Sequence, residues 1–109
     1  MSAPSSDGQA DAGTSGAVTR VMKICNEKGL HARASAKFVG VVEKFKDSAA
    51  ITVKRGDSEE TVSGDSIMGL MMLGAGIGSS ITVSATGAQA SEAIAALDAL
   101  VSGKFGEEE

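Results

Sequence analysis

His31, the single histidine of this 109-residue chain, is the residue whose type and setting best suit covalent chemistry. Arg33 lies two positions after it, and apolar residues at helical spacing begin directly beyond His31. A neutral imidazole is a nucleophile near pH 7, and a guanidinium binds phosphate oxygens through charge-assisted hydrogen bonds. The combination indicates a site at a helix start that takes up a phosphoryl group.

The backbone around His31 supports the same chemistry. The first N–H groups of a helix have no partner within the helix, and the helix dipole there favours negative charge. We therefore expect the N–H groups of Ala32 and Arg33 to bind the oxygens of a phosphoryl group, with Gly29 giving the chain a flexible approach to the site. The sequence has no second histidine and no Walker-type motif, so it suits a group carrier better than an independent enzyme.

The hydrophobic spacing predicts the elements that position these residues. Strands are predicted over residues 18–25, 50–54, 60–63 and 80–85, and helices over residues 32–45, 66–73 and 88–102. The order is β-α-β-β-α-β-α, with a hairpin over residues 50–63. This order predicts an α+β fold, an open-faced β-sandwich in which a four-stranded antiparallel sheet carries three helices on one face.

Composition limits the classes of function. The net charge of −4 and the pI of about 4.9 argue against nucleic acid and against an anionic membrane surface. A single cysteine, Cys25, cannot form an internal disulfide, and no apolar run approaches the length of a membrane span. One histidine and one cysteine cannot make a zinc site. We expect a cytoplasmic monomer that needs no metal and no cofactor.

The chain is expected to hold one domain between two tails. Residues 1–16 are mainly Gly, Ser, Ala and Asp, without the basic and apolar segments of a signal peptide, and are expected to be disordered. The domain is predicted over residues 17–106. Residues 107–109, three glutamates, are expected to form a solvated acidic tail.

Two segments resemble the signatures of a known family. Residues 29–39 (GLHARASAKFV) resemble the active-site signature of HPr, the histidine-containing phosphocarrier of the bacterial phosphotransferase system. Residues 66–73 (SIMGLMML) resemble its second signature, and the resemblance spans residues 17–106. One departure is Ala34, where the family usually has a proline that presets the helical φ. We expect the helix to start there nonetheless.

The resemblance implies a function and partners. His31 would be phosphorylated on Nδ1 by enzyme I, which draws on phosphoenolpyruvate, and would pass the group to IIA proteins or domains, while Arg33 holds the phosphate. The pathway is either sugar uptake or the nitrogen-related branch. The alternative is a regulatory HPr-like interaction protein whose phosphorylation state is read by its partners.

Ser66 has two interpretations. A serine before an apolar helical segment is a good N-cap. The resemblance implies that it is also a regulatory site, phosphorylated in some bacteria by HPr kinase/phosphorylase. The two roles are compatible, and a phosphate would add about two negative charges beside the partner surface.

The partner surface is expected to include Phe38, Ile67, Met68 and Met72. Met68 and Met72 lie one helical turn apart, and we expect them to face outward. Flexible methionines suit a surface that binds several partners, although a methionine cluster is more often part of a core.

Overall fold

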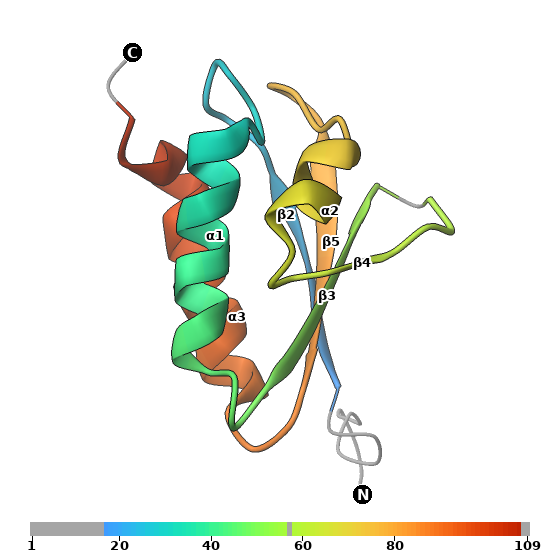
Figure 1. The fold of residues 1–109 in the computed structure, drawn as a ribbon, viewed down its shortest axis with the longest axis vertical. Helices are drawn as coiled ribbons and strands as arrows, with labels where there is room; N and C mark the ends of the chain where they lie inside the picture. The colour runs from blue at the N-terminus through green and yellow to red at the C-terminus, as the bar shows by residue number, and fades with distance from the viewer. Residues whose placement is uncertain (1–16, 57, 108–109) are drawn as a thin grey trace, which may run out of the picture.

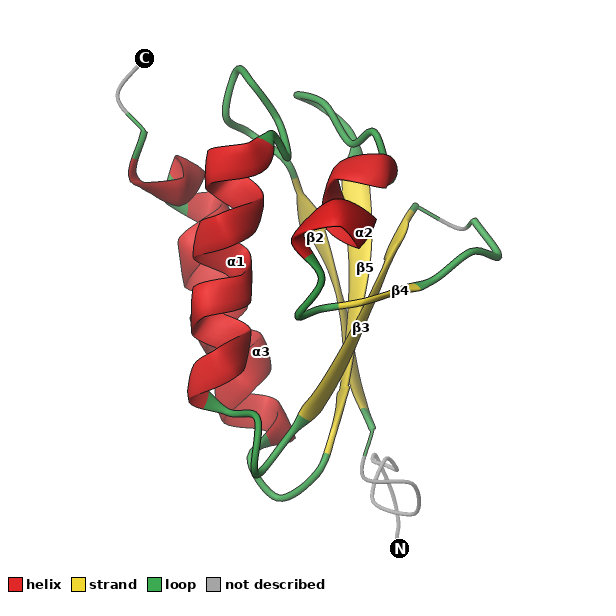
Figure 2. Ribbon diagram, in the orientation of Figure 1, coloured by secondary structure: helices red, strands yellow, loops and turns green. Residues whose placement is uncertain are grey.

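Strands and helices follow one another along the chain in the predicted order, β-α-β-β-α-β-α (Figures 1 and 2). The structure is a computed structural model and describes residues 17–56 and 58–107. The elements in this part of the chain are β2 (Val18–Lys23), α1 (Ala32–Lys44), β3 (Ala50–Arg55), β4 (Val62–Ser63), α2 (Ile67–Met72), β5 (Ser80–Thr86), α3 (Ala90–Ser102) and a 3₁₀ turn, η1 (Lys104–Gly106). The predicted tail over residues 1–16 and the last two glutamates lie outside the described residues.

The strands form one antiparallel sheet in the order β2-β5-β3-β4. β5 lies in the middle, where Val83 pairs with Arg20 of β2 on one side and with Val53 of β3 on the other. The predicted hairpin is confirmed by the pairing of β3 with β4, but β4 keeps only 2 residues. Only the last part of the segment predicted as a strand reaches the sheet.

One face of the sheet is covered by helices, and the other is open (Figure 2). Side chains alternate along β5, so that Ile81 and Val83 are fully buried while Thr82 and Ser84 are partly exposed. Helix α3 presents Ile94 and Leu97, both fully buried, to the sheet. The predicted open-faced α+β sandwich is therefore confirmed, with a mainly aliphatic core between the sheet and its helices that also contains Phe38 and Phe105.

The ends of the helices follow local signals. The Ser66 hydroxyl accepts a hydrogen bond from the backbone N–H of Gly69 at 3.0 Å, which confirms its predicted role as the N-cap of α2. Helix α3 begins two residues later than predicted, after Gly87, whose φ is +119° and where a Cβ would lie 2.4 Å from the Ser48 carbonyl oxygen. Within residues 17–56 and 58–107, none of the helices has the length and apolar character needed to cross a bilayer.

Candidate functional site

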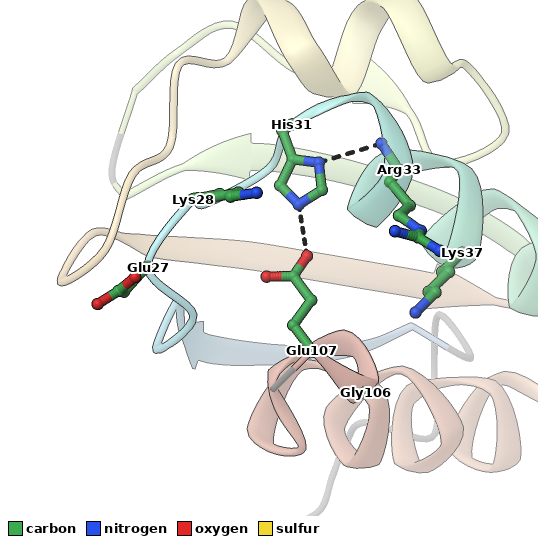
Figure 3. A pocket seen from close by; sticks show the side chains of 7 residues that line it. All are labelled: Glu27, Lys28, His31, Arg33, Lys37, Gly106 and Glu107. Atoms are coloured by element: carbon green, nitrogen blue, oxygen red, sulfur yellow. Dashed lines mark hydrogen bonds and ion pairs between the residues drawn. The ribbon is translucent and has the colours of Figure 1, made fainter. Parts of the chain in front are cut away.

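His31 is the N-cap of α1, and its imidazole closes the helix start (Figure 3). Its Nδ1 accepts a hydrogen bond from the backbone N–H of Arg33 at 3.2 Å. The His31 carbonyl accepts from the N–H of Ser35 at 2.8 Å, which is the first hydrogen bond of the helix. The imidazole thus takes the place of the short side chains that usually cap helices, and Nδ1 faces the N-terminus of α1.

The loop before His31 is fixed against the loop that follows α2. Gly29 has a φ of +67°, and a Cβ there would lie 2.5 Å from the carbonyl oxygen of Ala75. The N–H of Leu30 donates to the same carbonyl at 3.0 Å. The expectation of a flexible approach at Gly29 was wrong, because this glycine is needed for a left-handed turn in close contact with the neighbouring loop.

His31 and Arg33, predicted from the sequence, both line an open pocket of about 600 Å³. The complete lining is Glu27, Lys28, His31, Arg33, Lys37, Gly106 and Glu107 (Figure 3). Cationic side chains therefore outnumber carboxylates around the imidazole, which favours an anionic group. In the described part of the chain, no cluster of three or more His, Cys, Asp or Glu side chains could hold a metal ion.

Glu107 is a residue of this site that the sequence did not reveal. Its Oε2 is hydrogen-bonded to Nε2 of His31, and its Oε1 accepts from Nδ2 of Asn26 at 3.1 Å. The hydrogen bond with His31 is the largest cause of a lowered pKa of Glu107; burial opposes it, and the bond from Asn26 and the charge of Lys28 add to the lowering. The sequence placed Glu107 in a solvated tail, but its side chain is only 15% exposed.

A signal for this return of the chain is present in the sequence. Phe105 lies just beyond the last predicted helix, and so large an apolar side chain is rarely left in solvent near a domain edge. In the structure Phe105 is fully buried, and its carbonyl accepts a hydrogen bond from Lys37 Nζ at 2.6 Å. Burial of Phe105 brings Glu107 to the imidazole.

Three of the predicted partner-surface residues lie together on α2. Ile67, Met68 and Met72 are 39%, 67% and 80% exposed. Met71 joins them at 40%, whereas Leu70 is fully buried and anchors the helix to the core. We call Ile67, Met68, Met71 and Met72 the α2 surface. Ser66, at its N-terminal end, is partly exposed.

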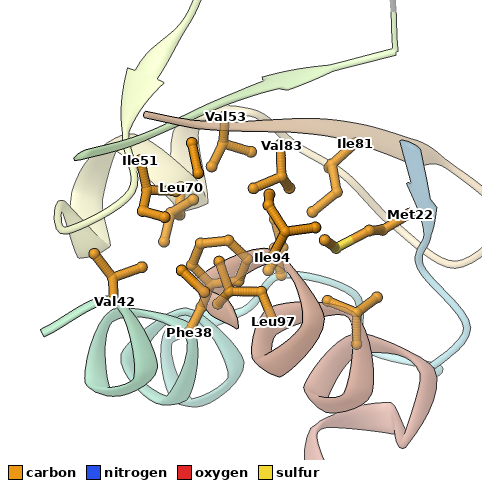
Figure 4. Packing of buried hydrophobic residues seen from close by; sticks show 14 of the residues in the cluster. Met22, Phe38, Val42, Ile51, Val53, Leu70, Ile81, Val83, Ile94 and Leu97 are labelled. Atoms are coloured by element: carbon orange, nitrogen blue, oxygen red, sulfur yellow. The ribbon is translucent and has the colours of Figure 1, made fainter. Parts of the chain in front are cut away.

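Phe38 does not belong to that surface. Its side chain is fully buried, and it lies between α1 and the sheet beside Leu97 (Figure 4). The reason is its helical position, one turn from both Ala34 and Val42 on the face of α1 that packs into the core. Its assignment to the partner surface was wrong.

Comparisons with known proteins identify relatives that match most of this chain. The family model described as "PTS HPr component phosphorylation site" matches residues 18–103. Phosphocarrier protein HPr of Neisseria meningitidis is 47% identical over 88 residues, which are 81% of this chain and 94% of that protein. Phosphocarrier protein NPr of Shewanella violacea is 42% identical over 88 residues, 81% of this chain and 92% of that protein. The crystal structure of HPr from Thermoanaerobacter tengcongensis superposes with a TM-score of 0.76 at 41% identity, covering 84% of this chain and 99% of that one.

Proposed function

The chain belongs to the HPr family, the phosphocarriers of the phosphotransferase system, and we propose that its His31 accepts a phosphoryl group on Nδ1 from phosphorylated enzyme I and passes it to IIA proteins. The observation that carries this proposal is the place of His31 as the N-cap of α1, with Nδ1 against the N–H of Arg33. The two halves of the transfer would use the same atom.

Phosphorylation changes the use of the helix N-terminus rather than its position. In the unmodified protein the Nδ1 lone pair accepts the Arg33 N–H. When that lone pair bonds to phosphorus, the N–H is released beside the phosphoryl oxygens. The N–H of Ala32 lies in the same first turn, and the Arg33 guanidinium adds a charge-assisted contact. The N–H groups at the start of α1 then bind the phosphoryl oxygens instead of the neutral Nδ1, and the helix itself need not move.

The α2 surface is the proposed docking site for enzyme I and the IIA proteins. Four apolar side chains are exposed on one short helix, where solvent alone would favour polar residues. α2 packs beside α1, and the loop that follows α2 is hydrogen-bonded at Ala75 to the loop that carries His31. A partner seated on α2 would therefore be close to the imidazole. Methionine side chains adapt to different partners without a change of backbone.

Ser66 is proposed as a regulatory site beside the α2 surface, phosphorylated by an ATP-dependent HPr kinase. Its hydroxyl is partly exposed and lies next to Ile67 and Met68. A phosphate there would be compatible with the N-terminus of α2, since helix N-termini favour negative charge. It would, however, place charge beside apolar side chains that partners must bury, and so would weaken docking without unfolding the helix.

The decisive test is phosphoryl transfer to a single residue. The protein is incubated with enzyme I and labelled phosphoenolpyruvate, and the same reaction is run with His31→Ala. We expect acid-labile label in the wild type, as for a phosphoramidate, and no label in the variant. Acid-stable label, or label that survives in His31→Ala, would overturn the proposal.

The docking proposal has its own test with a matched control. Met68→Ser combined with Met72→Ser removes the two most exposed side chains of the α2 surface. Val21→Ser removes a similarly exposed apolar side chain, 65% exposed, from the open face of the sheet. We expect weaker binding to enzyme I for the double variant alone. If the double variant bound enzyme I as tightly as Val21→Ser and the wild type do, the α2 surface would not be the docking site.

A further inference from the structure

Each nitrogen atom of the His31 imidazole forms a hydrogen bond, one with the Glu107 side chain and one with the backbone of Arg33. Nε2 is hydrogen-bonded to the carboxylate of Glu107, and Nδ1 accepts the backbone N–H of Arg33 (Figure 3). The His31 side chain is 27% exposed, so part of the ring remains open to a partner. The two contacts leave the ring little freedom to turn.

The chemistry of these contacts selects one tautomer. A carboxylate has no proton to donate, so the nitrogen that bonds it must carry one. A backbone N–H can only donate, so the nitrogen that faces it must offer a lone pair. Both requirements are met by the neutral imidazole with its proton on Nε2. The nitrogen left unprotonated is Nδ1, the atom that bonds to phosphorus under the proposed function.

Asn26 holds Glu107 in place. Its Nδ2 donates to Oε1 of Glu107 at 3.1 Å and to the carbonyl of Gly29 at 2.9 Å. Because both partners are acceptors, the orientation of the amide is fixed by its surroundings. Asn26 is fully buried, and its Oδ1 has no hydrogen-bond partner among residues 17–56 and 58–107. A buried, unpaired oxygen is unfavourable, and its retention fits an amide whose NH₂ group serves two specific acceptors.

The backbone before Glu107 is held in an unusual conformation. Lys104 and Phe105 have φ values of +59° and +55°, and Gly106 follows at +74°. The left-handed region is unfavourable for residues with a Cβ, and such residues persist where the surrounding structure compensates. Here the compensation is burial of Phe105 and the hydrogen bond from Lys37 to its carbonyl. This turn directs the Glu107 side chain towards His31.

We propose that Glu107 is a positioning residue for phosphoryl transfer, which keeps the His31 proton on Nε2 and presents Nδ1 to the phosphorus. The proposal rests on the phosphocarrier function. In the first transfer the Nδ1 lone pair forms the N–P bond, while the bond from phosphorus to the donor breaks and its electron pair stays with the donor. The ring becomes a cation that retains its Nε2 proton, hydrogen-bonded to the Glu107 carboxylate.

The second transfer reverses the first. The acceptor forms its bond to phosphorus, the Nδ1–P bond breaks, and its electron pair returns to Nδ1 of a neutral ring. No proton has to enter or leave in either step. The carboxylate stabilises the positive ring in between, and it lies on the Nε2 side, away from the phosphorus. The alternative to positioning is repulsion, in which the negative charge of Glu107 slows the approach of the negatively charged phosphoryl group. The experiments below distinguish positioning from repulsion.

The first measurement reads the tautomer without any phosphorylation. Nitrogen-15 NMR spectra of the imidazole are recorded at a pH where the ring is neutral, for the wild type, Glu107→Ala and Glu107→Gln. We expect the wild type to hold its proton almost entirely on Nε2, and Glu107→Ala to show a measurably larger share of the Nδ1-protonated tautomer, with the Arg33 N–H still favouring a lone pair on Nδ1. Glu107→Gln, which keeps an acceptor oxygen, should lie between them. The same tautomer ratio in all three proteins would overturn the proposal.

The second measurement is the rate of transfer from enzyme I to each variant and onward to a IIA protein. Loss of the partner that orients a metal-ligating histidine lowers affinity or activity by about 10–100-fold. By analogy we expect transfer to Glu107→Ala to slow on the order of tenfold, the lower end of that range, with a smaller loss for Glu107→Gln. Glu92→Gln removes one carboxylate charge, as Glu107→Gln does, at an exposed position of the first turn of α3, and it should accept and pass on the phosphoryl group at the wild-type rate. Faster transfer by Glu107→Ala would identify repulsion and overturn positioning. A wild-type protein that accepts no phosphoryl group would overturn the proposed function instead, while the tautomer ratios would still test the contact.

Discussion

Replacement of Gly29 by alanine tests whether the loop before His31 is held rigidly. The residue has a φ of +67°, and an added Cβ would lie 2.5 Å from the carbonyl oxygen of Ala75 and 2.8 Å from the Cα of Gly76. Both neighbours are backbone atoms, so neither can move aside as a flexible side chain would. The Leu30 N–H that donates to Ala75 at 3.0 Å belongs to the next residue and would be displaced with the loop.

The magnitude follows from these contacts. A left-handed conformation costs alanine about 1–2 kcal/mol, and the displaced hydrogen bond contributes about 1 kcal/mol. Alanine restricts the unfolded chain and returns about 0.4–1 kcal/mol. We therefore expect Gly29→Ala to lower the free energy of unfolding by about 2 kcal/mol. Domains of this kind are stable by about 5–15 kcal/mol, so the variant should remain folded at 25 °C.

Two other glycines provide controls. Gly40 lies on α1, and an added Cβ there would have no atom of the described residues within 4 Å other than its chain neighbours and its own helix backbone. Gly40→Ala should therefore gain about 1 kcal/mol of stability from helix propensity. Gly87 has a φ of +119° and a Cβ position 2.4 Å from the Ser48 carbonyl, so Gly87→Ala should be destabilised at least as much as Gly29→Ala. Gly87 lies just before the start of α3, whereas the pocket contacts the chain beyond its end, so only Gly29→Ala should disturb the site.

Urea unfolding measures the three free energies, and the rate of phosphorylation by enzyme I is then measured on folded protein. We expect slower phosphorylation for Gly29→Ala only. If Gly29→Ala were as stable as Gly40→Ala, the close contact with Ala75 would be wrong. If it were destabilised but phosphorylated at the wild-type rate, the loop would not position His31.

Four further outcomes follow from the structure. In His31→Ala the pKa of Glu107 should rise towards its ordinary value, because the hydrogen bond that mainly lowers it is removed. Carbon-13 NMR titration of the Glu107 carboxyl measures this pKa, and an unchanged value would contradict the contact with His31. Because that pKa is lower in the folded than in the unfolded chain, Glu107 stabilises the fold above its unfolded pKa and loses this effect as the pH falls through its folded pKa. The stability advantage of the wild type over Glu107→Gln, from urea unfolding at several pH values, should therefore shrink over that range, and a constant difference would argue against it. Phe38→Ala should lower the free energy of unfolding by about 3–5 kcal/mol, because Phe38 is fully buried, and Met72→Ala by no more than about 0.5 kcal/mol, because Met72 is exposed. Urea unfolding measures both, and equal losses in the two variants would refute the burial assigned to these side chains. Ser66→Ala should lose about 1 kcal/mol with its cap, whereas Ser66→Asp should keep the cap yet slow transfer from enzyme I; transfer at the wild-type rate would refute the regulatory role.

Much of the fold was predictable because its signals are local. Alternation in β5 and the helical spacing in α1 and α3 depend on residues a few positions apart, which the sequence displays directly. The place of His31 at a helix start was predictable for the same reason, since α1 begins one residue later. Ser66 was recognisable as an N-cap because the N–H it accepts lies three positions ahead.

The roles of residues whose contacts lie far along the chain were harder to predict from the sequence. Phe38 fits both an apolar helix face and an aromatic docking surface when only its type is considered, and its contact with the sheet decides between them. Gly29 was expected to be flexible, but its role is set by Ala75, which follows α2 far along the chain. A residue type alone does not show which distant backbone will approach it.

The sequence by itself was enough to predict His31 as the carrier residue, and the tertiary structure decided which groups hold its imidazole. His31 and Arg33 are near neighbours, so a single helical turn brings their groups together. Glu107 meets His31 across 76 positions and Asn26 across 81. Those contacts form because Phe105 is buried and the chain turns back through three left-handed residues. Only packing of the whole domain produces that turn, which is why the partner of the imidazole was hidden in a segment that reads as an acidic tail.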